Sequence, residues 1–351
     1  MDLKRLFSQS LLIILFLINF NVSGNTQKPF KVYVLFSYLP GLWSEEALKG
    51  VKQALLYNEF TSHDIRSYDY DYVRKRKNKD QEYSKIKKDI SDFNPDLIIV
   101  FDDEAAEDFI PRLNSFKIPI IATGINKEVK DLNWYLPEGN RNRYFTGILE
   151  RYPFEEPLKL LKKLNANITK ISILTTDNVS SNIITEQFKN KFLSYGGEYS
   201  GIKLADVMAS RKWEKWKEYI KGKRSKDEAF WILVPWDVYD ESGEEVKINI
   251  MGQFYQKESF IPELGIVNAS NLLGMLACFS VNSEDLAFEA VSIGIESQRK
   301  KKMLRDIPFQ KVQSARVIIN KKRADQLKIV IPLSFLDFAK IEKKIPLEHK
   351  R

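Results

Sequence analysis

The sequence predicts an α/β protein with two doubly wound lobes, each built on a parallel sheet. Near-continuous apolar runs such as residues 31–38 and 95–103 are typical of strands that helices cover on both faces. Amphipathic helices alternate with these runs. The same order restarts at residue 170, and a chain of 351 residues has room for two such domains.

The first series of elements runs from residue 31 to residue 125. Ser44 is the expected N-cap of its first helix, and Pro111 is expected to kink or end its last one. The predicted strands are 31–38, 63–72, 95–103 and 118–125, and the predicted helices are 44–60, 80–93 and 104–116. This βαβαβαβ order predicts a parallel sheet.

The second series runs from residue 170 to residue 302. Its predicted strands are 170–177, 198–206, 229–237, 260–270 and 275–282, and its main helices are 181–197, 211–223 and 283–302. A tail of a strand and a short helix follows at 314–335, which is too little chain for a third domain. We expect the tail to pack on the first lobe, so that lobe one comprises residues 27–145 plus 311–345 and lobe two residues 146–310.

The N-terminus has the pattern of a secretory signal peptide. Lys4 and Arg5 precede an apolar run, 11–20, that is too short to span a bilayer, and the small residues Ser23 and Gly24 follow. Residues 1–26 are therefore a predicted signal peptide, which predicts a periplasmic protein. An uncleaved membrane anchor is the alternative. The sequence has no cysteine near residue 24 to accept a lipid anchor.

Residues that usually carry catalysis are scarce. Cys278 is the only cysteine, which excludes an intramolecular disulfide, and it lies in an apolar run as a buried thiol would. His63 and His349 are the only histidines, which argues against a histidine metal site or a Ser-His-Asp triad. The chain has no G-x-S-x-G, P-loop, H-E-x-x-H or G-x-G-x-x-G motif. We predict no enzyme activity, no cofactor and no metal.

The charge pattern argues against a nucleic-acid partner. The formal net charge is +8, but basic residues are dispersed among acidic ones, except in the run 74–79. Recognition of nucleic acid needs stacking aromatic residues or a known binding motif, and the neighbouring tyrosines at 67–72 alternate with aspartates. The run is predicted to be a solvated loop.

A ligand site is predicted where the strands end. Ligands of open parallel sheets bind outside the carboxyl ends of the strands, where backbone amides and helix N-termini converge. In the first lobe these positions are Ser37, Tyr38, Trp43, Asp102, Asp103, Thr123 and Gly124. In the second lobe they are Thr176, Asp177, Ser181, Trp236, Asn268 and Phe279.

The residue types at these positions suggest the chemistry of the site. The aromatic side chains could form apolar walls, and the hydroxyl groups could donate hydrogen bonds. Asp102 and Asp103 could recognise a cationic or amino group. Each position has a structural alternative: the aspartates could cap the helix that follows them, Thr123 and Ser181 could be cap or turn residues, and Trp43 and Trp236 could be packing residues.

Three segments resemble the "ABC sub bind" type of ABC-transporter substrate-binding protein, which has the type I periplasmic-binding-protein fold. They are residues 95–125, residues 139–176 with "GNRNRYFTGIL", and the most specific, residues 314–339 with "SARVIINKKRADQLKIVIPLSF". The sequence departs from the family pattern at Lys328, where a glycine is usual, and at 40–50, where the residues are bulkier than usual.

The resemblance implies a hinge with several crossings, near residues 143–149, 280–282 and 309–314, so that the lobes close on a ligand by rigid-body rotation. It also implies a periplasmic solute-binding protein that presents a small molecule to an ABC permease. The alternative is a sensor module of the same fold that signals to a membrane kinase or cyclase. In either case we expect a monomer.

Overall fold

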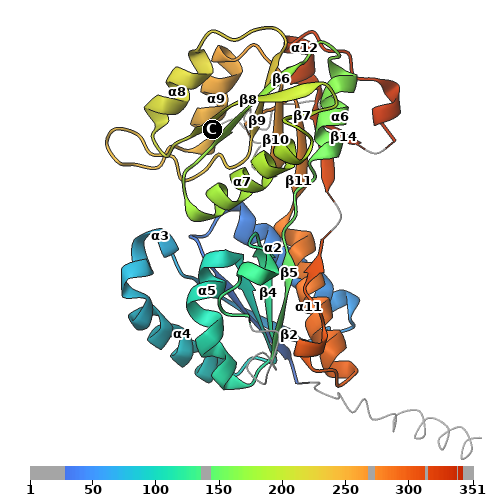
Figure 1. Ribbon diagram of the computed structural model, residues 1–351. Helices are drawn as coiled ribbons and strands as arrows, with labels where there is room; N and C mark the ends of the chain where they lie inside the picture. Colours follow the sequence, from blue (N-terminus) through green and yellow to red (C-terminus); the bar gives the residue numbers. More distant parts are fainter. Residues whose placement is uncertain (1–27, 136–143, 268–272, 313–314, 338, 343–351) are drawn as a thin grey trace, which may run out of the picture.

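The computed structural model describes residues 28–135, 144–267, 273–312, 315–337 and 339–342. It shows two lobes, one above the other in Figure 1, each with its own sheet and helices. Lobe one is the lower lobe in this view and lobe two the upper one. The predicted signal peptide, 1–26, lies outside the described residues.

Lobe one has a six-stranded parallel sheet in the order β12-β5-β4-β3-β1-β2. Its strands are β1 (Phe30–Phe36), β2 (His63–Asp69), β3 (Leu97–Phe101), β4 (Ile120–Ile125), β5 (Phe145–Leu149) and β12 (Gln310–Lys311). Its helices are α2 (Leu42–Tyr57), α3 (Tyr72–Lys75), α4 (Lys79–Phe93), α5 (Asp102–Leu113) and α11 (Ser283–Arg299). The central strands β3 and β4 are buried along their whole length, as their continuous apolar runs predict.

Two layers of helices cover this sheet. Helices α2 and α11 share one apolar core with it, and α4 and α5 share the other. The first pair packs closely because small residues lie at the contact: a methyl group on Gly50 would be 2.0 Å from the carbonyl oxygen of Glu284. In the same way, a methyl group on Gly294 would be 2.5 Å from the Leu97 side chain. These glycines seat α11 on lobe one.

Lobe two has an eight-stranded sheet in the order β14-β13-β11-β10-β9-β6-β8-β7. Its strands are β6 (Lys170–Thr175), β7 (Glu198–Tyr199), β8 (Ile202–Ala209), β9 (Glu228–Ile232), β10 (Glu263–Val267), β11 (Ala277–Val281), β13 (Arg316–Asn320) and β14 (Ala339–Glu342). Its helices are α6 (Glu155–Leu164), α7 (Val179–Ser194), α8 (Trp213–Lys221), α9 (Ile248–Glu258) and α12 (Lys321–Gln326). All pairs are parallel except β7 with β8 and β11 with β13.

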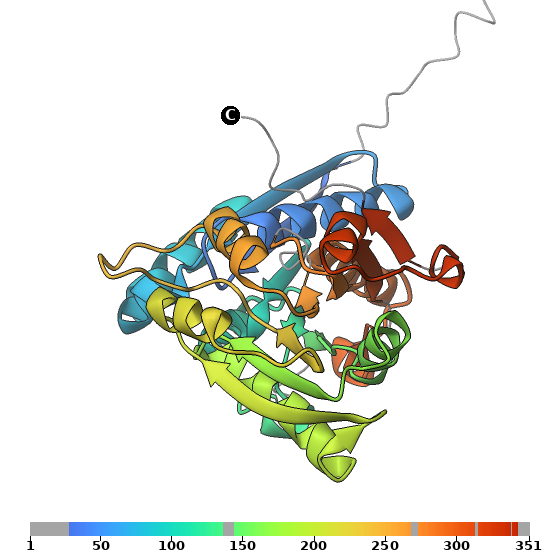
Figure 2. The same ribbon diagram turned by 90° about the horizontal axis from the view of Figure 1, so that it is seen from above.

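Helices also cover both faces of the second sheet. Helices α6, α7 and α12 contribute to one apolar core, and α8 and α9 to the other. Figure 2 looks down on lobe two, with α6 (green) and α9 (orange) on opposite sides of its strands. Cys278 is buried in β11, as its apolar surroundings predicted. Short 3-10 helices lie at Arg76–Asn78, Asn114–Phe116, Val129–Asp131, Leu304–Asp306 and Leu333–Phe335.

The predicted fold class is confirmed: two doubly wound lobes are joined by a hinge of several crossings. The chain passes from lobe one to lobe two after β5, returns between β11 and α11, and passes to lobe two again between β12 and β13. These places agree with the crossings that the family resemblance implied. Helix α6 packs on lobe two directly after the first crossing.

The predicted division into lobes needs a correction. Residues 311–345 were expected in lobe one, but β13, α12 and β14 belong to lobe two, because β13 pairs with β11 in an antiparallel ladder. Residues 146–310 were expected in lobe two. Within this range, however, residues 146–149 of β5, helix α11 and Gln310 of β12 belong to lobe one. The strand series alone did not reveal that the long helix after β11 returns to the first sheet.

The helix starts also differ in detail from the prediction. Helix α2 begins at Leu42, with Gly41 as its N-cap, so Ser44 is an internal residue. The hydroxyl of Ser44 bonds back to Gly41, 3.0 Å from both its amide nitrogen and its carbonyl oxygen. Ser44 therefore supports the start of the helix from its third position. Pro111 lies within the last turn of α5, which ends two residues later.

Candidate ligand-binding site between the lobes

Helix α7 of lobe two touches lobe one at two points. The Ser180 hydroxyl donates a hydrogen bond to Glu104 Oε1 at 2.8 Å, and Gln187 Nε2 donates to the carbonyl oxygen of Asn126 at 2.7 Å. Glu104 is in the first turn of α5, and Asn126 directly follows β4. Figure 1 shows α7 on the side of lobe two that faces lobe one. The carboxyl ends of β3 and β4 therefore face the second lobe, where the strand-end rule places a ligand.

Four carboxyl groups meet on the lobe-one side of this contact. Asp102, Asp103 and Glu104 open α5, and Glu150 follows β5 at the first crossing. Their exposed fractions are 7%, 2%, 4% and 2%. We call these four residues the interlobe carboxyl cluster. Across the described ranges, none of the four forms an ion pair with a lysine or arginine.

Asp103 is fully hydrogen-bonded within lobe one, whereas Asp102 is not. Asp103 accepts hydrogen bonds from the backbone amides of Asn126 at 2.9 Å and Lys127 at 3.1 Å, and so fixes the loop after β4. Asp102 has a left-handed backbone, with φ of 69°, which is uncommon for a residue other than glycine. Its Oδ2 is buried and has no hydrogen-bond partner.

The other two members contact the hinge and lobe two. Glu104 Oε1 accepts from the Tyr38 hydroxyl at 2.7 Å as well as from Ser180. Glu150 Oε1 accepts from the Tyr152 hydroxyl at 2.5 Å. The Tyr152 ring packs against the apolar cores of both lobes. Movement of one lobe against the other must therefore change the surroundings of this cluster.

Burial and mutual repulsion shift the acidity of the cluster. Burial raises the pKa of Asp102 well above its ordinary value, and the charges of Glu104, Glu150 and Asp103 add to the effect. Burial also raises the pKa of Asp103 and of Glu104. It raises the pKa of Glu150 to about 7, against opposing hydrogen bonds from Tyr152 and Asn126. The cluster therefore has unbalanced negative charge when it is ionised.

Several buried polar atoms of this region have no partner. The acceptors are Asp102 Oδ2, Glu104 Oε2 and Asn126 Oδ1, and the donor is Trp43 Nε1, whose nearness to the Asp102 carboxyl lowers the pKa of that group. Most buried polar atoms in folded proteins are hydrogen-bonded, because an unpaired one loses its hydration without compensation. Three such acceptors, two in the first turn of α5 and one directly after β4, offer positions that a hydrogen-bond donor could fill.

Trp43, Asp102 and Gly124 converge as the sequence predicted. Gly124 has φ of +71°, and a methyl group there would lie 3.1 Å from Asp102 Oδ1 and 3.8 Å from the Trp43 ring. Glycine is needed both for this backbone conformation and for the close approach of the two side chains. The alternative that Asp102 and Asp103 cap α5 is wrong, since the helix has no side-chain cap at its start.

Ser37 and Thr123 have framework roles instead of facing a ligand. The Ser37 hydroxyl donates to the carbonyl oxygen of Phe101 and accepts from the amide of Ala105, each at 2.9 Å. It therefore ties β1 to the start of α5. The buried Thr123 hydroxyl donates to the carbonyl oxygen of Leu286 in α11 at 3.4 Å. Both hydroxyls are engaged within lobe one.

The predicted residues of lobe two are dispersed. Ser181 and Thr176 belong to the start of α7: their hydroxyls are 3.0 Å apart, and the Ser181 amide donates to the Asn178 side chain, the N-cap. The contacts of Ser181 with the N-cap match its cap alternative. Asp177 is exposed. Asn268 lies outside the described residues.

The two predicted aromatic walls of lobe two differ from expectation. Phe279 lies within β11 and not after its end, and it is 4% exposed in the apolar core of lobe two. It therefore packs the lobe instead of lining the gap. Trp236 is half-buried and packs against the same core, which matches its packing alternative.

Sequence reasoning missed Asn126, Glu150 and Tyr152. Asn126 is the first residue after β4 and Glu150 the first after β5, so the strand-end rule points to both. The prediction instead chose Thr123 and Gly124 inside the predicted strand 118–125, and it did not apply the rule to the crossing near 143–149. Tyr152 has no such signal, because its position depends on how the first crossing packs between the lobes.

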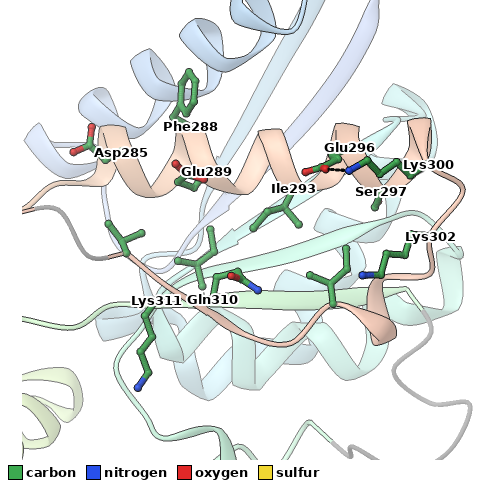
Figure 3. A pocket seen from close by; sticks show the side chains of 13 residues that line it. Asp285, Phe288, Glu289, Ile293, Glu296, Ser297, Lys300, Lys302, Gln310 and Lys311 are labelled. Carbon is green, nitrogen blue, oxygen red and sulfur yellow. Dashed lines mark hydrogen bonds and ion pairs between the residues drawn. The ribbon is translucent and has the colours of Figure 1, made fainter.

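A separate hollow of about 830 Å³ lies on lobe one, between α11 and the segment that leads into β12. Figure 3 shows Ile293 pointing into it from α11, with Lys302 and Lys311 on the opposite side. Phe288 points away toward α2, where its ring lies 5.4 Å from that of Tyr57. The hollow is distinct from the interlobe carboxyl cluster, since none of the four carboxyl residues lines it.

None of the helices in the described residues has the length and apolar character needed to cross a membrane. Within the same ranges, no three carboxylate, imidazole or thiol groups are arranged so that they could hold a metal ion. The spacing of the interlobe carboxyl cluster is therefore not that of a metal site.

The family pattern of the ABC transporter substrate binding proteins matches residues 40–343. The chain belongs to this family. The match begins before α2 and extends to the end of β14, so it includes both lobes and all three crossings. Members of this family are substrate-binding components of transporters. No curated protein matches the sequence significantly.

Solved structures of binding proteins have the same fold. An "ABC domain in complex with L-Trp" from Streptococcus pneumonia has a TM-score of 0.64 and 18% identity, with 89% of this chain and 100% of that chain covered. A ligand-free, open substrate binding protein with adhesive properties from Clostridium difficile has a TM-score of 0.63 and 17% identity, with 90% and 99% covered. A solute binding protein of a 5-methylthioribose transporter from Thermotoga lettingae has a TM-score of 0.52 and 12% identity, with 85% and 87% covered. Each shows what this family member resembles in fold.

Proposed function

We propose that the protein captures a small molecule between its lobes and presents it to the permease of an ABC transporter. Family membership supports the role in transport. The observation that carries the proposal is the meeting of the two lobes through Ser180 and Glu104, beside buried polar atoms that have no partner. A ligand that supplies those partners stabilises the closed arrangement over the open one.

Ligand titration of the purified mature protein tests the proposal. A ligand that binds only the folded protein stabilises it in proportion to RT ln(1 + [L]/Kd), about 2.7 kcal/mol at a concentration one hundred times Kd. We expect saturable binding at one site and a rise in Tm, with smaller effects in the Asp102→Asn variant. The control is Glu186→Gln, because Glu186 is exposed on α7 and pairs with Lys189 at the surface. The absence of a Tm shift with every class of small solute would contradict the proposal.

We also propose that the protein is located outside the cytoplasm. It is supported by the signal-like pattern of residues 1–26 and by the extracytoplasmic work of substrate-binding proteins. Expression of the full chain with a C-terminal tag and sequencing of the exported protein's N-terminus test this part. We expect a mature N-terminus between residues 24 and 28. An intact Met1 in the exported protein would instead indicate an uncleaved anchor.

A further inference from the structure

The interlobe carboxyl cluster has no cation of its own. Lys127 and Arg151 lie nearby, but the Lys127 ammonium pairs with Glu107, and Arg151 pairs with Glu128 at 3.0 Å. The remaining donors of Arg151 bond to backbone carbonyl groups. The chain as a whole has a formal net charge of +8, so this local excess of carboxylates is opposite in sign to the protein.

Asn126 gives an independent indication of a ligand. It is 3% exposed, and its Nδ2 lies 3.4 Å from both the Gly124 carbonyl oxygen and Glu150 Oε2. Its Oδ1 has no partner. The amide therefore offers a neutral acceptor beside the carboxylates, and the backbone of the same residue already contacts Gln187 of lobe two.

Arg211 of lobe two adds no net positive charge to the region that faces the interlobe carboxyl cluster. Its guanidinium bonds to Asp237 at 2.6 Å, and Asp237 also accepts from Asn178, the N-cap of α7. The pair is neutral as a whole, although the buried Nε of Arg211 has no hydrogen-bond partner. Asp237 has a left-handed backbone, with φ of 62°, as Asp102 does on the opposite lobe.

We infer that the ligand of the interlobe site is a small organic cation whose protonated amino group lies among Asp102, Glu104 and Asn126. This inference rests on the proposed function. An ammonium group has up to three N–H donors, which matches the three unpartnered acceptors Asp102 Oδ2, Glu104 Oε2 and Asn126 Oδ1. Charge-assisted hydrogen bonds of this kind are the strong ones in proteins. The Trp43 ring and Asp102 Oδ1 both lie within 4 Å of the position of a methyl group on Gly124, so an aromatic side chain borders this place.

The test compares ligands that differ only in their charged groups. Tryptamine, L-tryptophan and indole-3-propionate share an indole ring, and putrescine and adipate share a four-carbon chain. Each is titrated into the mature full-length protein by calorimetry and thermal shift. We expect at least one amine to bind, and to bind at least about tenfold more tightly than its matched carboxylate.

Charge-removing variants locate the bound amine. Asp102→Asn and Glu104→Gln keep the side-chain shape and are expected to weaken amine binding by about tenfold or more. Glu186→Gln is the control on the facing helix α7, since Glu186 is 59% exposed and pairs with Lys189 at the surface. Its effect is expected to be less than about twofold.

Other outcomes separate this inference from the proposed function. Tighter binding of L-tryptophan than of tryptamine, of a carboxylate than of its amine, or of a neutral sugar or nucleoside would overturn the inference and leave the solute-binding role intact. Stabilisation by Mg²⁺ or Ca²⁺ but by no amine would also overturn it. If no solute of any class binds, the proposed function fails as well.

Discussion

Glu150 is the residue at which the candidate site and the hinge coincide. It follows β5, where the chain leaves lobe one, and its carboxyl group contacts Tyr152 and Asn126. Burial raises the pKa of this carboxyl to about 7, and the nearby charge of Asp103 adds to the shift, while Arg151 opposes it. A buried carboxyl group that titrates near neutral pH makes both stability and closure sensitive to pH.

The folded protein is expected to lose stability as pH rises from 5 to 8. Glu150 binds its proton more tightly in the folded state than in the unfolded chain, so protonation of this carboxyl stabilises the folded state. This stabilisation is complete below pH 4.5, the ordinary pKa of the group, and is lost as pH rises past about 7. The shift in pKa corresponds to about 3 kcal/mol of unfolding free energy. Asp102, Asp103 and Glu104 act in the same direction, because their pKa values are also raised.

The Glu150→Gln variant checks this expectation by thermal denaturation across the pH range. It is expected to lose less stability than the wild type between pH 5 and pH 8, since its side chain cannot ionise. Glu107→Gln, an exposed change on α5, serves as the control and is expected to follow the wild type. Parallel curves for the wild type and Glu150→Gln would contradict the assignment.

Gly124→Ala tests the close approach of Trp43 and Asp102 to Gly124. The new methyl group would lie 3.1 Å from Asp102 Oδ1, and the backbone has φ of +71°. We expect a loss of about 1–2 kcal/mol from the backbone conformation, together with weaker ligand binding because Asp102 must move. Gly243→Ala is the matched control, with φ of +82° and nothing within 4 Å. Equal effects of the two changes on binding would show that the contact is unimportant.

Part of the candidate site could be predicted from the sequence, and the reason is physical. Trp43, Asp102 and Gly124 were found because the carboxyl ends of parallel strands meet at one edge of the sheet. The same rule could not tell that the Ser37 hydroxyl would be used up between Phe101 and Ala105. Which polar atoms remain without a partner depends on three-dimensional contacts that strand positions do not specify.

At the scale of elements, the C-terminal tail is fixed to lobe two by a buried ion pair. Arg323 of α12 is 2% exposed, and its Nε lies 2.9 Å from Oε1 of Glu263, a wholly buried residue of β10. Its Nη2 also donates to the carbonyl oxygen of Ser259 at 2.9 Å. Glu263 Oε2 in turn accepts from the amide of Leu276. The pair therefore joins α12, β10 and the start of β11.

Arg323→Met is expected to destabilise the protein by about 3–5 kcal/mol, because it leaves the Glu263 carboxylate buried without its partner. Lys321→Met is the matched control on the same helix: Lys321 pairs with Asp325 at the surface, and its loss is expected to change stability by less than about 1 kcal/mol. Chemical denaturation measures both. The prediction is wrong if the double variant Arg323→Met, Glu263→Leu is less stable than Arg323→Met alone.

The same pair explains what the sequence could not show about the fold. The alternation of strands and helices predicted both sheets, since apolar periodicity reports local burial. It did not predict the lobe of the tail, because a strand pattern such as β13 does not identify its neighbour. Pairing of β13 with β11 and of Arg323 with Glu263 are long-range contacts. The return of α11 to lobe one likewise depends on close packing at Gly50 and Gly294.

For the molecule as a whole, the lobes meet in the described residues through the crossings and a small set of further contacts. Arg316 of β13 pairs with Glu284 and Asp285 of α11 at 3.3 and 2.9 Å. Tyr152 packs against both apolar cores, and Ser180 and Gln187 of α7 reach lobe one through hydrogen bonds. Polar contacts of this kind are readily exchanged for water, which allows rigid-body rotation about the crossings. The hollow beside α11 is lined by residues of β5, α11 and the segment through β12, which all lie on lobe one, so rotation of the lobes is expected to change its shape little.

Removing the two α7 contacts is expected to shift the ligand-free protein toward an open arrangement. A hydrogen bond to a charged group contributes about 1.5–3 kcal/mol, so loss of the bond from Ser180 to Glu104 alone changes the ratio of closed to open molecules by about tenfold or more. Small-angle scattering of Ser180→Ala, Gln187→Ala should give a larger radius of gyration than the wild type. Ser194→Ala, at the far end of α7, is the control, because its hydroxyl bonds only to the Lys191 carbonyl oxygen. Saturating ligand should reduce the radius of gyration again, since the bound molecule supplies contacts to both lobes. Identical scattering of the wild type, the double variant and the control without ligand would exclude the Ser180 and Gln187 contacts as determinants of closure.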